Sequence, residues 1–146
     1  MSTLTALGRG DLKNVRRQKL RVTALEERID SLRSRAEYTR QQLGACGHSD
    51  PTRDRLAEYV AELDKLEREL TGEMIALEKQ LVAVDAELAK LPENQEKVLR
   101  LRYCEGLSWK KVAEKVGYSE RQSVRIEKTA FSEKKPQERL VNGTKP

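Results

Sequence analysis

Residues 91–131, LPENQEKVLRLRYCEGLSWKKVAEKVGYSERQSVRIEKTAF, decide the fold of this chain. Two glycines, Gly106 and Gly117, divide the stretch into three segments, each with apolar residues at helical spacing. Glycine commonly ends helices and permits the tight turns between them. The stretch therefore predicts three short helices connected by short turns.

The first of these helices is predicted over residues 93–104. The Leu91-Pro92 step marks its start, because the residue before a proline disfavours the helical conformation and Pro92 can occupy a first helical turn. Gly106 ends it. Its apolar side consists of Val98, Leu99, Leu101 and Tyr103.

The second and third helices have the features of a helix-turn-helix. Ser108 can cap the second helix and Ser119 the third, where Gln122 completes a capping box. Two crossing helices need a small residue where they touch, and Ala113 fits this requirement. Gly117 follows four residues later and can adopt the positive φ that the turn requires.

The third helix separates into an apolar arc and a basic arc at 100° per residue. The apolar arc contains Ser123, Val124, Ile126, Ala130 and Phe131. In the major groove, arginine can pair with guanine and glutamine with adenine, and lysines on the preceding helix can contact phosphates. The predicted DNA-contacting residues are Arg121, Gln122, Arg125 and Lys128 on the third helix, and Lys110, Lys111 and Lys115 on the second.

Residues 11–43 have the heptad pattern of a long amphipathic helix. Asp11 can cap a helix that begins at Leu12, and Gly44 is a suitable C-cap. Apolar residues recur every seven positions, with a second set three residues later: Val15, Val22, Ile29, Ala36 and Leu43, with Leu25 and Leu32.

A second long helix is predicted from about residue 52 to 90. Asp50 as N-cap and Pro51 at the first helical position mark its start. One heptad row consists of Leu56, Leu63, Leu70, Leu77, Val84 and Leu91. We expect a partner row four residues later, at Val60, Met74, Leu81 and Leu88, interrupted by Glu67.

The pairing of the two long helices has three possible forms. Residues 1–43 carry ten Lys and Arg against five Asp and Glu, whereas residues 44–91 carry six against eleven. These opposite charges and the short turn favour an antiparallel hairpin. A parallel coiled-coil dimer, or a hairpin that dimerises into a four-helix bundle, also satisfies the heptads. We therefore expect a homodimer or higher homo-oligomer through the coiled coil.

The predicted fold class is all-α, a long antiparallel helical hairpin followed by a helix-turn-helix head. The predicted division is a flexible lead-in at 1–10, the hairpin at 11–91, a DNA-binding domain at 92–131 and a flexible tail at 132–146.

Composition excludes several classes of function. A net charge of +5 favours an anionic partner. No apolar run approaches the roughly 20 residues that a membrane-spanning helix needs.

Candidate metal and catalytic sites are weak. Cys46 and His48 could form one pair of metal ligands, but no second pair accompanies them. The sequence also has no P-loop to bind a nucleotide and no nucleophile with a neighbouring base. We expect a cytoplasmic protein that is not an enzyme and binds no membrane, metal or cofactor.

The head resembles region 4 of bacterial sigma factors, the domain that reads an upstream promoter element. The matching features are Leu91-Pro92, Gln95, Val98-Leu99, Leu101-Arg102-Tyr103, Gly106, Ser108, Ala113, Gly117 and Ser119. The order of hairpin and head is also similar to a family of small phage-encoded sigma-like regulators. Ser123 departs from the pattern of such families, which bury an aliphatic residue there, and this predicts a rotated or imperfectly packed third helix.

The resemblance implies sequence-specific binding of double-stranded DNA and regulation of phage or prophage genes in a host bacterial cytoplasm. RNA polymerase is then a possible partner of the hairpin. Because nothing resembles sigma region 2, the chain is not expected to melt a promoter. The alternatives are a small terminase subunit that binds phage DNA, and a coiled-coil protein–protein adaptor without DNA binding.

Overall fold

The computed structural model describes residues 8–46 and 50–132, and these are almost entirely helical. The elements are α1 (Arg9–Cys46), α2 (Asp50–Leu88), α3 (Glu93–Leu99), the π-helical turn η1 (Arg100–Cys104), α4 (Trp109–Val116) and α5 (Glu120–Ser132). The all-α prediction is confirmed. The predicted tail lies outside the described residues except Ser132, as does the predicted lead-in except residues 8–10.

The chain divides into two compact units. One contains residues 20–76, the greater part of α1 and α2. The other contains residues 1–19 together with 77–146, so that the first turns of α1 and the end of α2 belong with the head.

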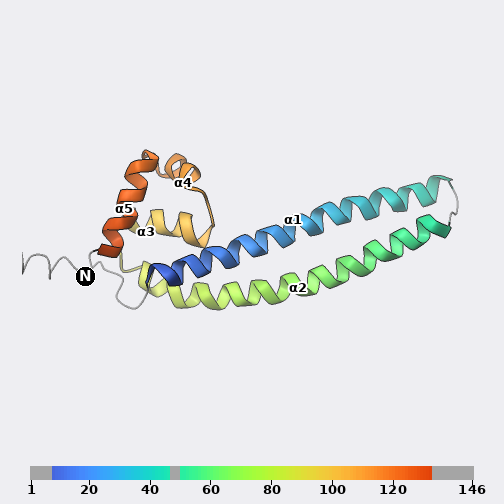
Figure 1. Ribbon diagram of the computed structural model, residues 1–146, viewed down its shortest axis with the longest axis horizontal. Coiled ribbons are helices and arrows are strands. Elements are labelled where there is room, and N and C mark those ends of the chain that lie inside the picture. The colour runs from blue at the N-terminus through green and yellow to red at the C-terminus, as the bar shows by residue number, and fades with distance from the viewer. Residues whose placement is uncertain (1–7, 47–49, 133–146) are drawn as a thin grey trace, which may run out of the picture. The chain divides into compact units, whose positions relative to one another are not determined.

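In the unit 20–76, α1 and α2 lie side by side in opposite directions and form an antiparallel hairpin within one chain (Figure 1). The core of this hairpin is a cluster of Leu25, Ile29 and Leu66, against which further leucines pack. Ion pairs that join the helices, such as Arg21–Glu73 at 3.6 Å and Arg28–Glu62 at 3.8 Å, lie at the edges of this seam. Their side chains are mostly exposed, so apolar burial and not ion pairing provides most of the stability.

The predicted register of α1 is confirmed. The buried residues recur at intervals of three, four or seven along the helix: Val15, Gln18, Val22, Leu25, Ile29, Ala36 and Thr39. Thr39 is polar, but its hydroxyl donates a hydrogen bond to the Arg35 carbonyl at 2.9 Å. A threonine can therefore occupy the seam without leaving its hydroxyl unpaired.

The predicted register of α2 is partly wrong. The row of Leu63, Leu70 and Leu77 is buried or half-buried, and so are the predicted partners Leu81 and Leu88. The predicted partners Val60 and Met74, however, are 47% and 48% exposed. In this part of α2, the seam instead uses positions three residues after the leucine row: Tyr59, Leu66 and Glu73 are buried or half-buried. Leu66 supplies the apolar contact that decides this register, and Arg21 compensates the charge of Glu73.

Three predicted helix ends also differ from the structure. α1 begins at Arg9, so Asp11 lies in its first turn, where the carboxylate accepts a hydrogen bond from the Gly8 N–H at 2.9 Å. Gly44 lies inside α1 and does not cap it. Pro92 is the residue before α3 and has an extended conformation, with a ψ of 153°.

The predicted first helix of the head is confirmed in extent but not in geometry. It consists of α3 followed by η1, in which the Glu105 N–H donates to the Arg100 carbonyl at 2.9 Å, five residues back. Gly106, with a φ of 75°, then ends it as predicted. Leu101 and Tyr103, two residues apart in this turn, are both buried.

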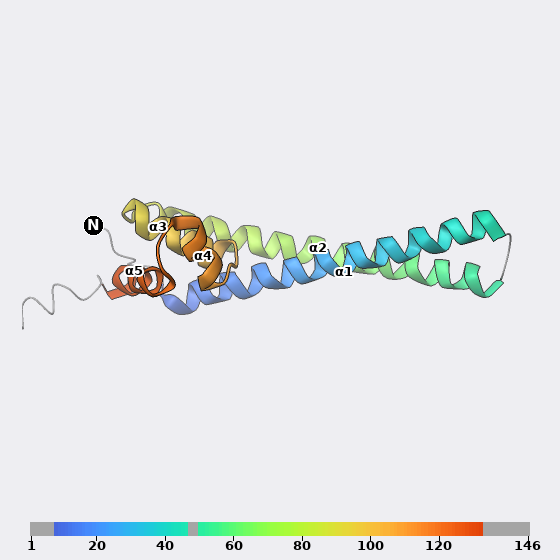
Figure 2. The ribbon, with the colours of Figure 1, turned by 90° about the horizontal axis from the view of Figure 1, so that it is seen from above.

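The head contains α3, η1, α4 and α5, which pack around one small core (Figure 2). Val98, Leu101 and Val112 form its centre, with Leu107, Trp109, Val116 and Ile126 packed against them. In the part of the chain that the structure describes, no helix is long and apolar enough to span a membrane.

The α2 register makes a testable prediction. Leu66→Ala should lower the free energy of unfolding by about 2–5 kcal/mol, because it removes a buried leucine from the seam. Val60→Ala should cost less than about 1 kcal/mol, because Val60 is half-exposed. Urea unfolding followed by circular dichroism measures both. Equal losses for the two variants would show that the register is wrong.

Candidate nucleic-acid interface

The serines that were predicted to cap α4 and α5 do so. Ser108 and Ser119 each accept a hydrogen bond at the side-chain oxygen from the backbone N–H three residues later, at 3.3 and 3.0 Å. These bonds satisfy N–H groups that have no partner within the helix. Both helices of the helix-turn-helix therefore begin at positions that the local sequence fixes.

Gly117 forms the turn between α4 and α5. Its φ is 81°, and its N–H donates to the Ala113 carbonyl at 2.9 Å. The N–H of Tyr118 donates to the same carbonyl at 3.2 Å. Because an L-residue is strained in this left-handed conformation, glycine is the residue that allows α5 to start so soon after α4 ends.

Ser123 does not rotate α5 away from the core. It is fully buried, and its hydroxyl donates to the Ser119 carbonyl at 2.9 Å. The hydrogen bond removes the cost of burying a hydroxyl in place of an aliphatic group. The expected rotation is therefore corrected: Ser123 occupies the inner face of α5 together with Ala130, which is also fully buried.

A buried carboxylate lies on the same inner face. Glu127 is 7% exposed and accepts a hydrogen bond from the Tyr103 hydroxyl of η1. Arg9, at the start of α1, lies 3.9 Å from the same carboxylate oxygen, and its guanidinium stacks 4.6 Å from the centre of the Phe131 ring. Burial and the bond to Glu127 together raise the pKa of Tyr103 far above its usual value. Glu127 therefore joins α5 to η1 and α1 within this unit.

Sequence reasoning missed Glu127. The residue lies four positions after Ser123 and three before Ala130, and this helical spacing places it inside the apolar arc. This position could have identified Glu127 as a buried, paired residue, since a glutamate among buried neighbours requires a partner. Its partners Tyr103 and Arg9 are distant in sequence and have no detectable pattern of their own.

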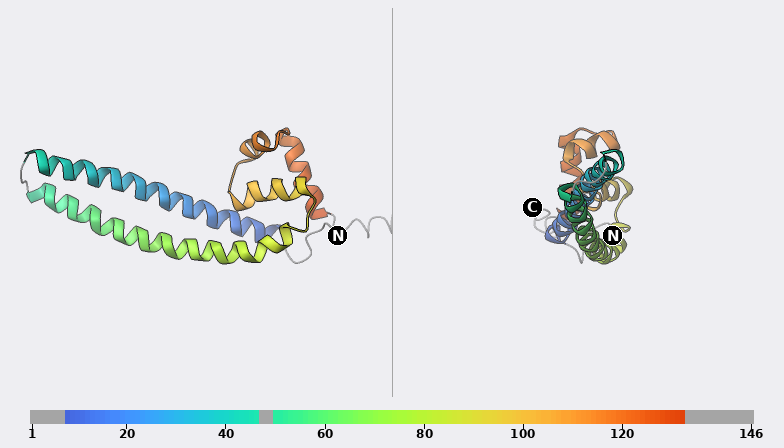
Figure 3. Two further views of the ribbon diagram at one scale, coloured as in Figure 1. Left: turned by 180° about the vertical axis from the view of Figure 1, so that it is seen from behind. Right: turned by 90° about the vertical axis from the view of Figure 1, so that its right-hand side faces the viewer.

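The outer face of the helix-turn-helix carries the predicted DNA-contacting side chains. Figure 3 shows α4 and α5 from behind, with α5 beside both α3 and α4. All seven predicted residues are exposed: Lys110, Lys111 and Lys115 on α4, and Arg121, Gln122, Arg125 and Lys128 on α5. Lys111 also lies 3.9 Å from Glu114, and Lys128 makes an interaction within the chain. The structure thus separates a basic outer face of α5 from its buried inner face.

Cysteine and histidine side chains were the other candidate ligands or reactive groups. Among the described residues, no group of three His, Cys, Asp or Glu side chains is close enough to hold a metal ion. The side chains of Cys46 and His48 lie outside the described residues. Cys104 is a half-buried free thiol, and burial raises its pKa, which lowers its reactivity.

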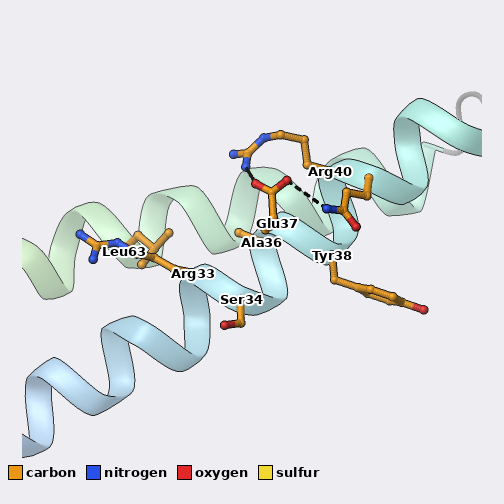
Figure 4. A pocket seen from close by; sticks show the side chains of 8 residues that line it. Arg33, Ser34, Ala36, Glu37, Tyr38, Arg40 and Leu63 are labelled. Carbon is orange, nitrogen blue, oxygen red and sulfur yellow. Dashed lines mark hydrogen bonds and ion pairs between the residues drawn. The ribbon is translucent and has the colours of Figure 1, made fainter.

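A shallow groove lies on the hairpin in the unit 20–76 (Figure 4). Its carboxylate, Glu37, accepts hydrogen bonds from Arg40 at 2.9 Å and Gln41 at 3.4 Å, all on α1. Arg33, which also lines the groove, pairs with Glu67 of α2 at 2.5 Å, so the main charged groups of this groove already have partners within the hairpin.

Comparison with known proteins identifies a family but no function. A family model described as "Protein of unknown function (DUF722)" matches residues 22–135. The chain belongs to this family. No curated protein and no solved structure matches it.

The Gly117 turn can be tested with two glycine substitutions of opposite sign. Gly117→Ala should lower the free energy of unfolding by about 1–2 kcal/mol, because alanine is strained at positive φ. Gly72→Ala should raise it by about 1 kcal/mol, since Gly72 lies within α2 with open space around it. Thermal unfolding compares both with the native chain, and a stabilising Gly117→Ala would contradict the turn.

The Tyr103–Glu127 hydrogen bond can be tested by removing one hydroxyl group. Tyr103→Phe should cost about 1–3 kcal/mol, because it leaves a buried carboxylate without its donor. Tyr118→Phe removes the same hydroxyl from a tyrosine that is 38% exposed and should be nearly neutral. Denaturant unfolding provides the measurement. Equal effects would contradict a specific role for the buried bond.

Proposed function

We propose that this protein binds double-stranded DNA sequence-specifically and regulates transcription of phage or prophage genes from the host bacterial cytoplasm. The observation that carries the proposal is the two-sided α5. Its inner face is fixed by Ser123, Glu127 and Ala130, and its outer face presents Arg121 and Arg125. A helix of this kind, following a tight turn after a shorter helix, is the usual element that enters a major groove.

The roles of individual residues follow from their chemistry. Arg121, Gln122 and Arg125 lie in the first half of α5, from which a recognition helix reaches base edges. Arginine can contact guanine with two hydrogen bonds, and glutamine can contact adenine in the same way. Lys128 farther along the helix, and the lysines of α4, would contact phosphates, which position a protein without reading sequence.

The hairpin has a separate role in this proposal. It would bring two DNA-binding heads together by forming a homo-oligomer, or would contact RNA polymerase. Val60, Met74 and Ile75 supply exposed apolar area on α2 for such a contact. This part rests on the resemblance to sigma-like regulators and on these side chains.

Binding to DNA from the genome that encodes the protein tests the proposal. Labelled fragments are measured by gel shift or fluorescence anisotropy at two salt concentrations. A DNA reader should show a steep loss of affinity with salt, because bound phosphates release counterions. One or a few fragments should be preferred over the rest.

The double variant Arg121→Ala with Arg125→Ala should abolish this preference. Each lost bidentate contact to a base is worth about 1–3 kcal/mol of discrimination. Arg53→Ala with Arg55→Ala removes the same charge from exposed positions in α2 and should leave the preference unchanged. If the α5 variant still selects the same fragment, α5 is not the recognition helix.

A further inference from the structure

Two arginines from distant parts of the chain meet at the loop that precedes α4. Arg16 of α1 donates from Nη2 to the Gly106 carbonyl at 3.5 Å, and Arg102 of η1 donates from Nη1 to the Leu107 carbonyl at 3.1 Å. The two guanidinium groups are thus bound to consecutive carbonyls of one loop. All of these residues belong to the unit that contains the head.

The two guanidinium groups lie close enough to repel each other. Burial lowers the pKa of Arg16, and the charge of Arg102 lowers it further. Among the residues that the structure describes, neither arginine forms an ion pair with a carboxylate. Within the described residues, the site therefore holds two positive charges that no ion pair neutralises.

Arg100, in the same turn η1, shows the opposite arrangement. It pairs with Asp85 at 2.7 Å and with Glu96 at 2.9 Å. Although burial lowers its pKa, the hydrogen bonds to these carboxylates raise it overall. The fold thus supplies carboxylates to Arg100, which stabilises the head, and supplies none to Arg16 and Arg102.

Each member of the arginine pair also has an unsatisfied donor. The Nε atoms of Arg16 and Arg102 are buried and have no hydrogen-bond partner among the described residues. Burying a donor without a partner costs free energy, and the cost is greater when the group is charged. An anion that draws the two side chains toward it would offer acceptors to these groups and compensate their charge.

Trp109 fixes the orientation of one member of the pair. The Arg102 guanidinium stacks over the indole ring at 4.7 Å from its centre. Trp109 is itself packed against the core of the head. Arg102 is therefore held in position in advance, which reduces the entropy that anion binding would cost.

We propose that Arg16 and Arg102 together bind a phosphate group at the loop 105–108. Two guanidinium forks match the paired oxygen atoms of a phosphate, whereas a spherical anion such as chloride presents no pair of acceptor atoms to a fork. The phosphate has two candidate sources. One is the DNA backbone, and this source rests on the proposed function. The other is free phosphate in solution. In either case, the start of α1 contributes directly to binding by the head.

The first arm of the test uses inorganic phosphate as the probe. Thermal unfolding of the full chain is measured in sodium phosphate and in sodium chloride of equal ionic strength. Phosphate should raise the melting temperature of the native chain, because a ligand of the folded state stabilises it. Arg16→Gln should remove this rise. Arg17→Gln, which removes an exposed charge bonded to Asn14 on another face of α1, should retain it.

The second arm uses a labelled mixed-sequence duplex and measures affinity over a range of salt. If the site binds a backbone phosphate, Arg16→Gln should reduce the slope of log affinity against log salt by about 0.9, while Arg17→Gln leaves it unchanged. Arg16→Lys keeps the charge but not the fork, and should weaken the phosphate effect without unfolding the head. Circular dichroism of each variant reports whether the head is folded.

The outcomes separate this inference from the proposed function. A phosphate effect that Arg16→Gln removes, without any change in DNA binding, supports the site and assigns it to free phosphate. A native chain that binds no DNA but shows this phosphate effect refutes the proposed function and supports the site. If Arg16→Gln and Arg17→Gln behave alike in both arms, the arginine pair is not an anion site.

Discussion

The arrangement of the head depends on the contacts that the buried carboxylate of Glu127 makes with Tyr103 and Arg9. A charged group inside a small core is tolerated only when it is paired. If one partner is removed, the desolvation cost of the buried charge is no longer compensated. Tyr103 and Arg9 provide that pairing from two other elements. Any rotation of α5 about its axis would break both contacts, so one rotation is selected. In that rotation Arg121 and Arg125 face outward, which makes the basic face a consequence of the core.

The same rule explains why polar residues occupy positions that a purely apolar pattern would exclude. Ser123 in α5 and Thr39 in α1 can be buried because each hydroxyl donates a hydrogen bond to a carbonyl of the preceding turn. Glu73 is half-buried at the edge of the hairpin seam, where Arg21 pairs with it. In the sequence, such polar residues interrupt the apolar pattern of the helix. In the structure they fix how the helix packs against its neighbour, since a shift of the helix would leave a polar group unpaired.

These cases show which features local sequence determines and which it does not. The caps at Ser108 and Ser119 and the turn at Gly117 were predictable, because each bond spans three or four residues. The α2 register was not, because apolar residues occur both three and four positions after its leucine row, and the choice depends on α1. The π-helical turn η1 and the pairing of Arg9 with Glu127 arise from tertiary packing, for which the sequence has no local signal. Whether the outer residues of the helix-turn-helix contact DNA stays a prediction.

Four partly buried or ion-paired arginines of the unit that contains the head, Arg9, Arg16, Arg100 and Arg102, form two pairs that differ in their partners. Arg100 has two carboxylates and Arg9 has one, and these residues connect elements of the fold. Among the residues that the structure describes, Arg16 and Arg102 are held by backbone carbonyls and a ring, which fix their positions but do not compensate their charge. A neutral acceptor satisfies a donor without cancelling its positive potential. Arg9 and Arg100 therefore connect elements of the fold through their carboxylates, whereas Arg16 and Arg102, like the exposed cations on the outer faces of α4 and α5, keep a positive potential at the surface of this unit.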